Sequence, residues 1–190
     1  IECFDNSNLG GTNPVASCVV FKNGKPSKKD YRQFKIQNIY GPDDFASMEQ
    51  VIYRRLKRLS EEKEPLPNLI IVDGGKGQLS SGLKSIKKLG LENDIAIIGI
   101  AKKLEEIYKP NDKLPLYIDK KSETLKLIQQ LRNEAHRFAI KFHRNRRSKN
   151  ALKSGIDTIK GVGPVLKDKH LKKYKSFKRL RNAEENELID

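Results

Sequence analysis

Asp5, Asp73 and His136 are the residues whose types and places in the sequence suit metal-assisted hydrolysis. Each aspartate ends a short apolar run, Ile1–Asp5 for the first and Leu69–Val72 for the second. If the two runs are neighbouring strands, both carboxylates lie at one edge of a sheet, where Mn²⁺ or Mg²⁺ finds the oxygen ligands it prefers. Such a cation polarises a phosphoryl group and lowers the pKa of an attacking water. A single aspartate after a strand is more often a turn or cap residue, so the hypothesis depends on the pair.

His136 lies on a long helical pattern whose apolar stripe runs through Leu125, Leu131 and Phe138. At 3.6 residues per turn it lies about 200° around the helix from Phe138, so it is not an ordinary core histidine. A histidine exchanges protons near neutral pH, which suits a metal ligand, a general base or a proton carrier. The alternative is a solvated histidine on an exposed helix face.

A glycine-rich turn, Gly74-Gly75-Lys76-Gly77-Gln78, follows the second aspartate. The spacing of a nucleotide-binding phosphate loop is absent, so we reject that function. The glycines permit a sharp turn and a close approach of a ligand, and Lys76 at the start of the next helix would attract a DNA phosphate. A purely structural strand-to-helix turn explains the segment equally well.

The elements that must position these residues follow the order strand, strand, strand, helix, strand, helix, strand, closed by a long helix. Period-two and period-3.6 patterns and the turns between them predict a mixed sheet with helices on its faces, an α/β fold of mixed α+β order. Asn23-Gly24 predicts a tight hairpin, and Asp43 a helix cap. The expected strands are 1–5, 15–22, 29–36, 69–72 and 95–101, and the expected helices begin near 43, 78 and 122.

The chain changes in texture near residue 150, which predicts a domain over 1–150 and a small all-α unit over 151–190. Short helices there surround Gly161-Val162-Gly163-Pro164, the pattern of a helix-hairpin-helix. Backbone N–H groups of Gly161, Val162 and Gly163 would bind a DNA phosphate without reading sequence. A Gly-x-Gly turn between helices is on its own a weak signal.

The composition is strongly basic, with 39 Lys and Arg against 24 Asp and Glu, a net charge of +15 and a pI near 9.8. Nucleic acid is therefore the first partner to expect. Basic residues concentrate in 132–153, with eight against one acid, and in 160–181, with nine against one. An anionic membrane surface is the rival partner, but no apolar run of about 18 residues exists.

Cys3 and Cys18 are the only cysteines, and neither has a second ligand at zinc spacing. Both are expected to be buried, reduced thiols of a cytoplasmic protein. The start at Ile1 without Met suggests an excised fragment.

Several motifs in fixed order resemble the UvrC family, the excinuclease subunit of bacterial nucleotide excision repair. The resemblance runs from the first residue through the glycine hairpin, so it spans nearly the whole chain. It rests on Ile1-Glu2-Cys3-Phe4-Asp5, Val72-Asp73-Gly74-Gly75-Lys76-Gly77-Gln78, Gly99-Ile100-Ala101-Lys102 and Arg132-Asn133-Glu134-Ala135-His136-Arg137.

The resemblance implies a ribonuclease H-like endonuclease that cuts DNA on the 5′ side of a lesion with an Asp-Asp-His triad. Carried over, the catalytic residues are Asp5, Asp73 and His136, with both aspartates as ligands of Mn²⁺ or Mg²⁺. Asp44 matches a supporting acid, although a helix N-terminal charge explains it equally well. The implied partners are damaged double-stranded DNA, UvrB through a segment absent from this sequence, and indirectly UvrA, with no membrane. Residues expected to contact DNA are Lys76, Arg137, His143, Arg144, Arg146, Arg147, Gly161, Val162 and Gly163.

Two functions remain open on the sequence. The first is a metal-dependent DNA endonuclease with a single tightly held cation, because one histidine replaces a third carboxylate. The second is a non-catalytic DNA-binding module on a ribonuclease H-like scaffold, since a fold does not fix a function. Loss of nicking in Asp73→Asn would favour the first.

Overall fold

The structure of the 190-residue chain is a computed structural model. It describes residues 1–7, 15–37, 43–101, 106–157, 163–174 and 177–184. For 143–157 and for residues 164, 167, 168, 171, 177 and 178 it describes the backbone path alone. The chain divides into two compact units, Ile1–Ile140 and Lys141–Asp190. The boundary predicted at residue 150 lies within one continuous helix, and the two predicted domains stay a prediction.

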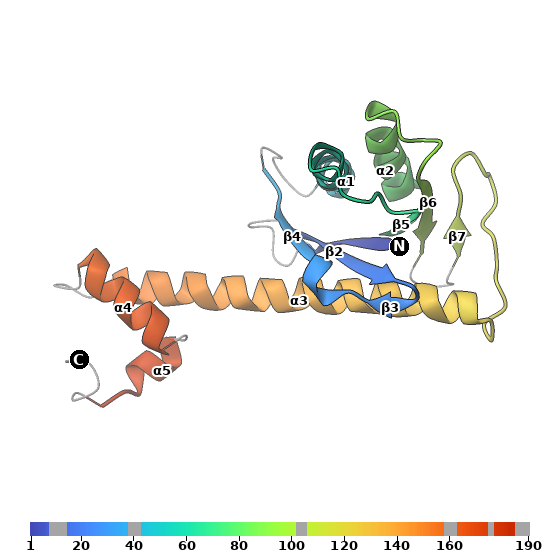
Figure 1. The fold of residues 1–190 in the computed structure, drawn as a ribbon. Helices are drawn as coiled ribbons and strands as arrows, with labels where there is room; N and C mark the ends of the chain where they lie inside the picture. The colour runs from blue at the N-terminus through green and yellow to red at the C-terminus, as the bar shows by residue number, and fades with distance from the viewer. Residues whose placement is uncertain (8–14, 38–42, 102–105, 158–162, 175–176, 185–190) are drawn as a thin grey trace. The chain divides into compact units, whose positions relative to one another are not determined.

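A seven-stranded mixed sheet forms the centre of the first unit (Figure 1). Its strand order is β3-β2-β1-β5-β6-β7, and β4 pairs with β2 beside β3. The strands β1, β5 and β6 are parallel, and all other pairs are antiparallel. This arrangement confirms the predicted mixed sheet. The bounds are β1 Glu2–Ser7, β2 Val15–Lys22, β3 Lys25–Pro26, β4 Arg32–Lys35, β5 Leu69–Asp73, β6 Ala96–Ile100 and β7 Ile107–Tyr108.

The first strands confirm a meander but add a feature that the pattern did not predict. Asn23 and Gly24 have φ values of 51° and 74°, the left-handed backbone of a two-residue hairpin turn. This hairpin leads only to the two-residue strand β3, and a 3₁₀ turn, Lys28–Asp30, precedes β4. The predicted strand over 29–36 is therefore shorter and begins at Arg32.

Helices cover both faces of the sheet, with α1 (Asp44–Glu61) and α2 (Lys76–Lys88) on one side and α3 (Glu123–Asp157) on the other (Figure 1). Asp43 caps α1 as predicted, since its carboxylate accepts hydrogen bonds from the amides of Phe45 and Ala46 at 3.0 and 2.9 Å. Gly90 ends α2 with φ 68°. Leu116 forms an isolated bridge with Ile107 of β7.

The core lies between the sheet and these helices and is built from the predicted apolar positions. Buried side chains of α1, α2 and α3 meet the fully buried residues of β1, β5 and β6. Phe45 lies outside this core, because it is 52% exposed, although its three-residue spacing from Met48 is typical of the apolar stripe of a helix. Fully buried members include Phe4, Met48, Ile52, Leu56, Ile70, Ile71, Ile86, Ile100, Leu125 and Leu131.

Successive side chains of β1 point to opposite faces of the sheet. Cys3 and Asp5 lie on the α3 face, whereas Glu2, Phe4 and Asn6 lie on the α1 face. Glu2 makes a buried ion pair with Arg55 of α1, with 2.6 Å between Arg55 Nη2 and Glu2 Oε1. This pair fixes β1 against α1 on the face opposite Asp5.

The second unit contains α4 (Pro164–Tyr174) and α5 (Phe177–Arg181), which agrees with the predicted short helices. His170 and Tyr174 of α4 are buried, and their rings lie 5.9 Å apart. Among the described residues, no helix is long and apolar enough to cross a membrane.

Candidate active site

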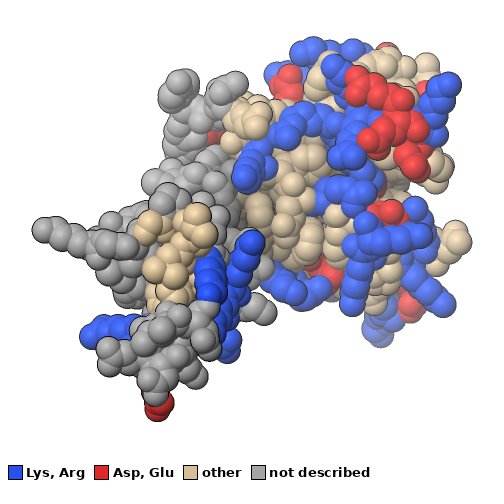
Figure 2. All heavy atoms as spheres, turned by 60° about the vertical axis from the view of Figure 1, so that its left-hand side comes forward, with Lys and Arg blue, Asp and Glu red and all other residues tan. Residues whose placement is uncertain are grey.

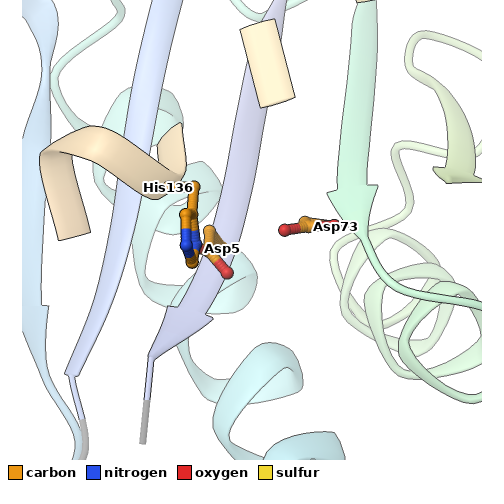
Figure 3. Close-up of side chains that lie close together, drawn as sticks. All are labelled: Asp5, Asp73 and His136. Carbon is orange, nitrogen blue, oxygen red and sulfur yellow. The ribbon is translucent and has the colours of Figure 1, made fainter. Parts of the chain in front are cut away.

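Strands β1 and β5 bring Asp5 and Asp73 together, and α3 adds His136 (Figure 3). Asp73 ends β5. The strand predicted to end at Asp5 continues to Ser7. In the parallel pairing, Cys3 lies opposite Ile71 and Phe4 opposite Val72, so the next positions along the two strands are Asp5 and Asp73. One ligand atom from each of Asp5, Asp73 and His136 lies within 4.8 Å of the others. The three residues singled out from the sequence therefore form one site.

Burial differs sharply within this group. Asp5 and Asp73 are 2% and 9% exposed, whereas the side chain of His136 is 50% exposed. Nδ1 of His136 lies 3.1 Å from Oδ2 of Asp5. With the proton on Nδ1, the imidazole donates to this carboxylate and keeps Nε2 as a proton acceptor.

The pKa of the Cys3 thiol reflects the negative charge around Asp5 and Asp73. Cys3 is a free, fully buried thiol two residues before Asp5 on the same face of β1, as expected from the sequence. Burial, together with the negative charges of Asp73 and Asp5, raises the pKa of the Cys3 thiol well above its usual value, and the positive charge of Arg132 opposes this rise. The α3 face of the sheet thus concentrates negative charge where a cation would bind.

The glycine-rich turn after Asp73 is packed tightly against its neighbours. A Cβ atom on Gly99 of β6 would lie 2.7 Å from the backbone oxygen of Gly74, and one on Gly77 would lie 2.3 Å from the ring of Phe45. Phe45 thus packs on Gly77 at the start of α2, which explains why it is not in the core. Close packing thus leaves no room for a side chain at Gly99, and at Gly77 a side chain would displace the Phe45 ring, whereas a Cβ atom on Gly75 would meet no atom within 4 Å. Close approach of a ligand to the turn stays a prediction.

Lys76 is the first residue of α2 and is exposed. Its ammonium group donates to the backbone oxygen of Lys113 at 2.5 Å and lies 5.5 Å from the centre of the Tyr108 ring. Contact of Lys76 with DNA stays a prediction, and it would require this side chain to share or leave the Lys113 contact.

Asp44 is the first residue of α1 and lies outside the group formed by the three site residues. Its backbone oxygen accepts a hydrogen bond at 2.7 Å from the side-chain amide of Asn6, the neighbour of Asp5. The start of α1 is thereby tied to the end of β1. A supporting role for the Asp44 carboxylate stays a prediction.

Of the basic residues predicted to contact DNA, Arg137 is exposed on α3. It forms two hydrogen bonds of 2.7 Å to the carboxylate of Glu134, and these bonds hold the pKa of Glu134 below its usual value. The side chains of His143, Arg144, Arg146 and Arg147, and the residues Gly161 and Val162, lie outside what the structure describes; Gly163 is exposed just before α4. Lys and Arg side chains cover much of the face shown in Figure 2.

One residue next to the site had no signal in the sequence. Ser17 lies opposite Asp5 in the β1–β2 pairing and is completely buried. Its hydroxyl donates to the backbone oxygen of Ala135, the residue before His136, at 3.0 Å. In the sequence, a serine within an apolar strand cannot be distinguished from any other small core residue. Only the structure shows that α3 packs on Ser17 and accepts its hydrogen bond.

Residues 1–140 match the family model of the UvrC RNase H endonuclease domain. The chain belongs to the UvrC family. This assigns the described sheet, its flanking helices and the three clustered residues to an RNase H-like, phosphodiester-hydrolysing endonuclease domain, and it confirms the resemblance and the fold predicted from the sequence.

Two relatives and one solved structure are similar to this chain. It is 67% identical to UvrABC system protein C of Flavobacterium psychrophilum and 65% identical to that of Christiangramia forsetii, over its whole length of 190 residues. It covers 32% of each of these proteins, so it spans about a third of their length. A crystal structure of Ciona intestinalis endonuclease V bound to a 24mer DNA is 21% identical with a TM-score of 0.39, covering 70% of this chain and 55% of that one.

Proposed function

We propose that this UvrC-family domain hydrolyses a DNA phosphodiester with one divalent cation, Mn²⁺ or Mg²⁺, held by Asp5 and Asp73. The observation that carries the proposal is the meeting of two buried carboxylates and an imidazole within 4.8 Å. Two buried carboxylates this close repel one another, and a cation held by both would remove that repulsion. When bound, it supplies polarisation of the phosphoryl group and a more acidic attacking water.

The side chains of the domain have separate tasks in this reaction. Asp5 orients the imidazole of His136 through the contact at Nδ1. His136, half exposed at the surface, then accepts or returns a proton at Nε2 without leaving this contact. Asp5 and Asp73 are buried, so bulk water has little access to the carboxylates that would hold the cation.

Nicking of supercoiled plasmid in Mn²⁺ tests the proposed function. We expect the wild type to nick plasmid DNA and Asp73→Asn to lose nicking, because only one of the two carboxylate ligands remains. Asp73→Asn should still bind DNA, because the amide preserves the size of the side chain. Asp94→Asn, which removes an exposed acid from the loop before β6, serves as the matched control and should nick normally. Equal nicking by the wild type and Asp73→Asn would eliminate this site as the catalytic centre. DNA binding by the wild type without nicking in either Mn²⁺ or Mg²⁺ would favour a non-catalytic DNA-binding module.

The biological setting is part of the same proposal. The names of the relatives refer to the UvrABC system, and this supports cooperation with UvrB and, through it, UvrA. The resemblance of the sequence motifs to the UvrC family supports damaged double-stranded DNA as substrate and incision on the 5′ side of a lesion. Action in the bacterial cytoplasm stays a prediction from the sequence.

A further inference from the structure

We infer that Ser17 is a positioning residue for His136, an inference that rests on the proposed function of the Asp5, Asp73 and His136 site. Ser17 joins the two elements on which the histidine depends. It belongs to β2, directly opposite Asp5 of β1, and its hydroxyl donates at 3.0 Å to the Ala135 carbonyl of α3. The bond therefore links Ser17, which lies opposite Asp5, to Ala135, which precedes His136 in the chain.

The geometry explains why this bond matters more than its strength suggests. Apolar packing of Leu131 and Ala135 holds α3 on the sheet but tolerates small rotations and shifts along the helix axis. A hydrogen bond accepts only a narrow range of distance and angle. Because Ala135 and His136 are consecutive, the bond fixes the backbone that carries the imidazole, and with it the 3.1 Å contact between Nδ1 and Asp5.

Loss of the hydroxyl leaves the fold intact but frees this helix turn. Removal of a partner that holds a reacting side chain in place typically lowers activity or metal affinity about 10- to 100-fold. We therefore expect Ser17→Ala to lower kcat by roughly that factor. KM for plasmid DNA should not change, since Ser17 is buried and cannot contact the substrate.

Ser85 offers a matched control for the loss of stability. It is also completely buried, and its hydroxyl donates to a backbone oxygen on a neighbouring helix, that of Glu49 in α1, at 2.7 Å. Ser85→Ala therefore removes the same kind of bond on the opposite face of the sheet. Both variants should lower the urea midpoint of unfolding to a similar extent.

The experiment compares wild type, Ser17→Ala, Ser85→Ala and Asp73→Asn in kcat and KM for nicking in Mn²⁺, and in the ring ¹H–¹³C NMR signal of His136 without metal. The inference requires Ser17→Ala alone among the serine variants to lower kcat and to shift the His136 signal. Equal kcat values for the two serine variants, or an unchanged His136 signal in folded Ser17→Ala, would overturn it. Should the alanine variant not fold, Ser17→Cys, which is similar in size but a weak donor, must show the same changes.

Failure of the proposed function is separable from failure of this inference. If the wild type and Asp73→Asn nick equally, the proposed catalytic site is wrong. The NMR comparison of Ser17→Ala with Ser85→Ala still decides whether Ser17 positions His136, because it needs neither metal nor turnover.

Discussion

His136 combines two properties that an acid–base residue needs and that seldom occur together. Half of its side chain is exposed to solvent, so protons and substrate can reach it, yet its Nδ1 atom lies against a carboxylate that is only 3% exposed. The buried partner defines the orientation of the ring, and the exposed side leaves room for a phosphate. The division of tasks that we propose for the three residues follows from this difference in burial.

Replacement of His136 tests this division at the level of one side chain. We expect His136→Gln to lower the single-turnover nicking rate roughly 10²- to 10⁴-fold, the usual contribution of a general acid or base, because glutamine cannot exchange a proton. DNA affinity, measured by fluorescence anisotropy, should stay within about twofold of wild type, since glutamine is similar in size to histidine and keeps hydrogen-bonding groups at this position. Gln130→Ala, an exposed change two turns earlier on α3, is the control. A normal nicking rate in His136→Gln would leave the proton transfer to another group.

At the scale of elements, the turn after β5 is held in place by the strand beside it. Gly99 of β6 lies so close to Gly74 that there is no room for a side chain, and the atom in the way is a backbone oxygen that cannot swing aside. The path of the chain leaving Asp73 is therefore fixed by a residue that is not itself in the site.

Gly99→Ala tests this constraint. The added methyl group must displace β6 or the turn, which we expect to cost about 1–3 kcal/mol in the free energy of unfolding. Gly75→Ser is the matched comparison, because no atom lies within 4 Å of its Cβ position, its φ of −82° suits any residue, and serine is a favoured N-cap. Urea unfolding should show a destabilised Gly99→Ala and a Gly75→Ser at least as stable as wild type. Equal stability of the two variants would show that the turn adapts.

The sequence predicted those parts of the fold that local patterns encode. Apolar runs ending in aspartate located β1, β5 and the site carboxylates, and an apolar stripe located α3 and the half-exposed place of His136. The two-residue strand β3 and the 3₁₀ turn before β4 were missed because such short elements carry no period. Phe45 has the spacing of a core residue, and only its packing on Gly77 explains its exposure. Ser17 gained a role only when the hydrogen bond to α3 was seen.

At the scale of the whole molecule, positive charge is the dominant feature. The net charge of +15 is distributed over both units, and the basic side chains of α4 include exposed Lys169 and Lys172. Sequence-independent attraction to the phosphates of DNA follows, with an affinity that falls steeply as salt rises. Such attraction would bring DNA to the domain, but it would not determine which phosphodiester bond of the DNA is cut.

Lys169→Gln combined with Lys172→Gln tests whether the second unit contributes to this binding. Each lost phosphate contact should reduce the slope of log affinity against log salt by about 0.9, or about 1.8 for the pair. Lys57→Gln with Arg58→Gln removes the same charge from α1, where both residues are paired with glutamates at 3.7 and 2.8 Å. Fluorescence anisotropy over a salt series gives the slopes. An unchanged slope in the α4 variant, or an equal reduction in both, would remove α4 from the DNA-binding surface.

The buried ion pair between Glu2 and Arg55 also protects the protein against a specific folding error. Because side chains alternate along a strand, a slip of β1 by one residue would exchange its two faces and present Phe4 or Asn6 to α3 in place of Asp5. The same slip would carry Glu2 away from Arg55 and leave a charge buried without its partner, at a cost of about 3–5 kcal/mol. The ion pair on the α1 face of β1 thus favours the register that places the Asp5 carboxylate on the α3 face.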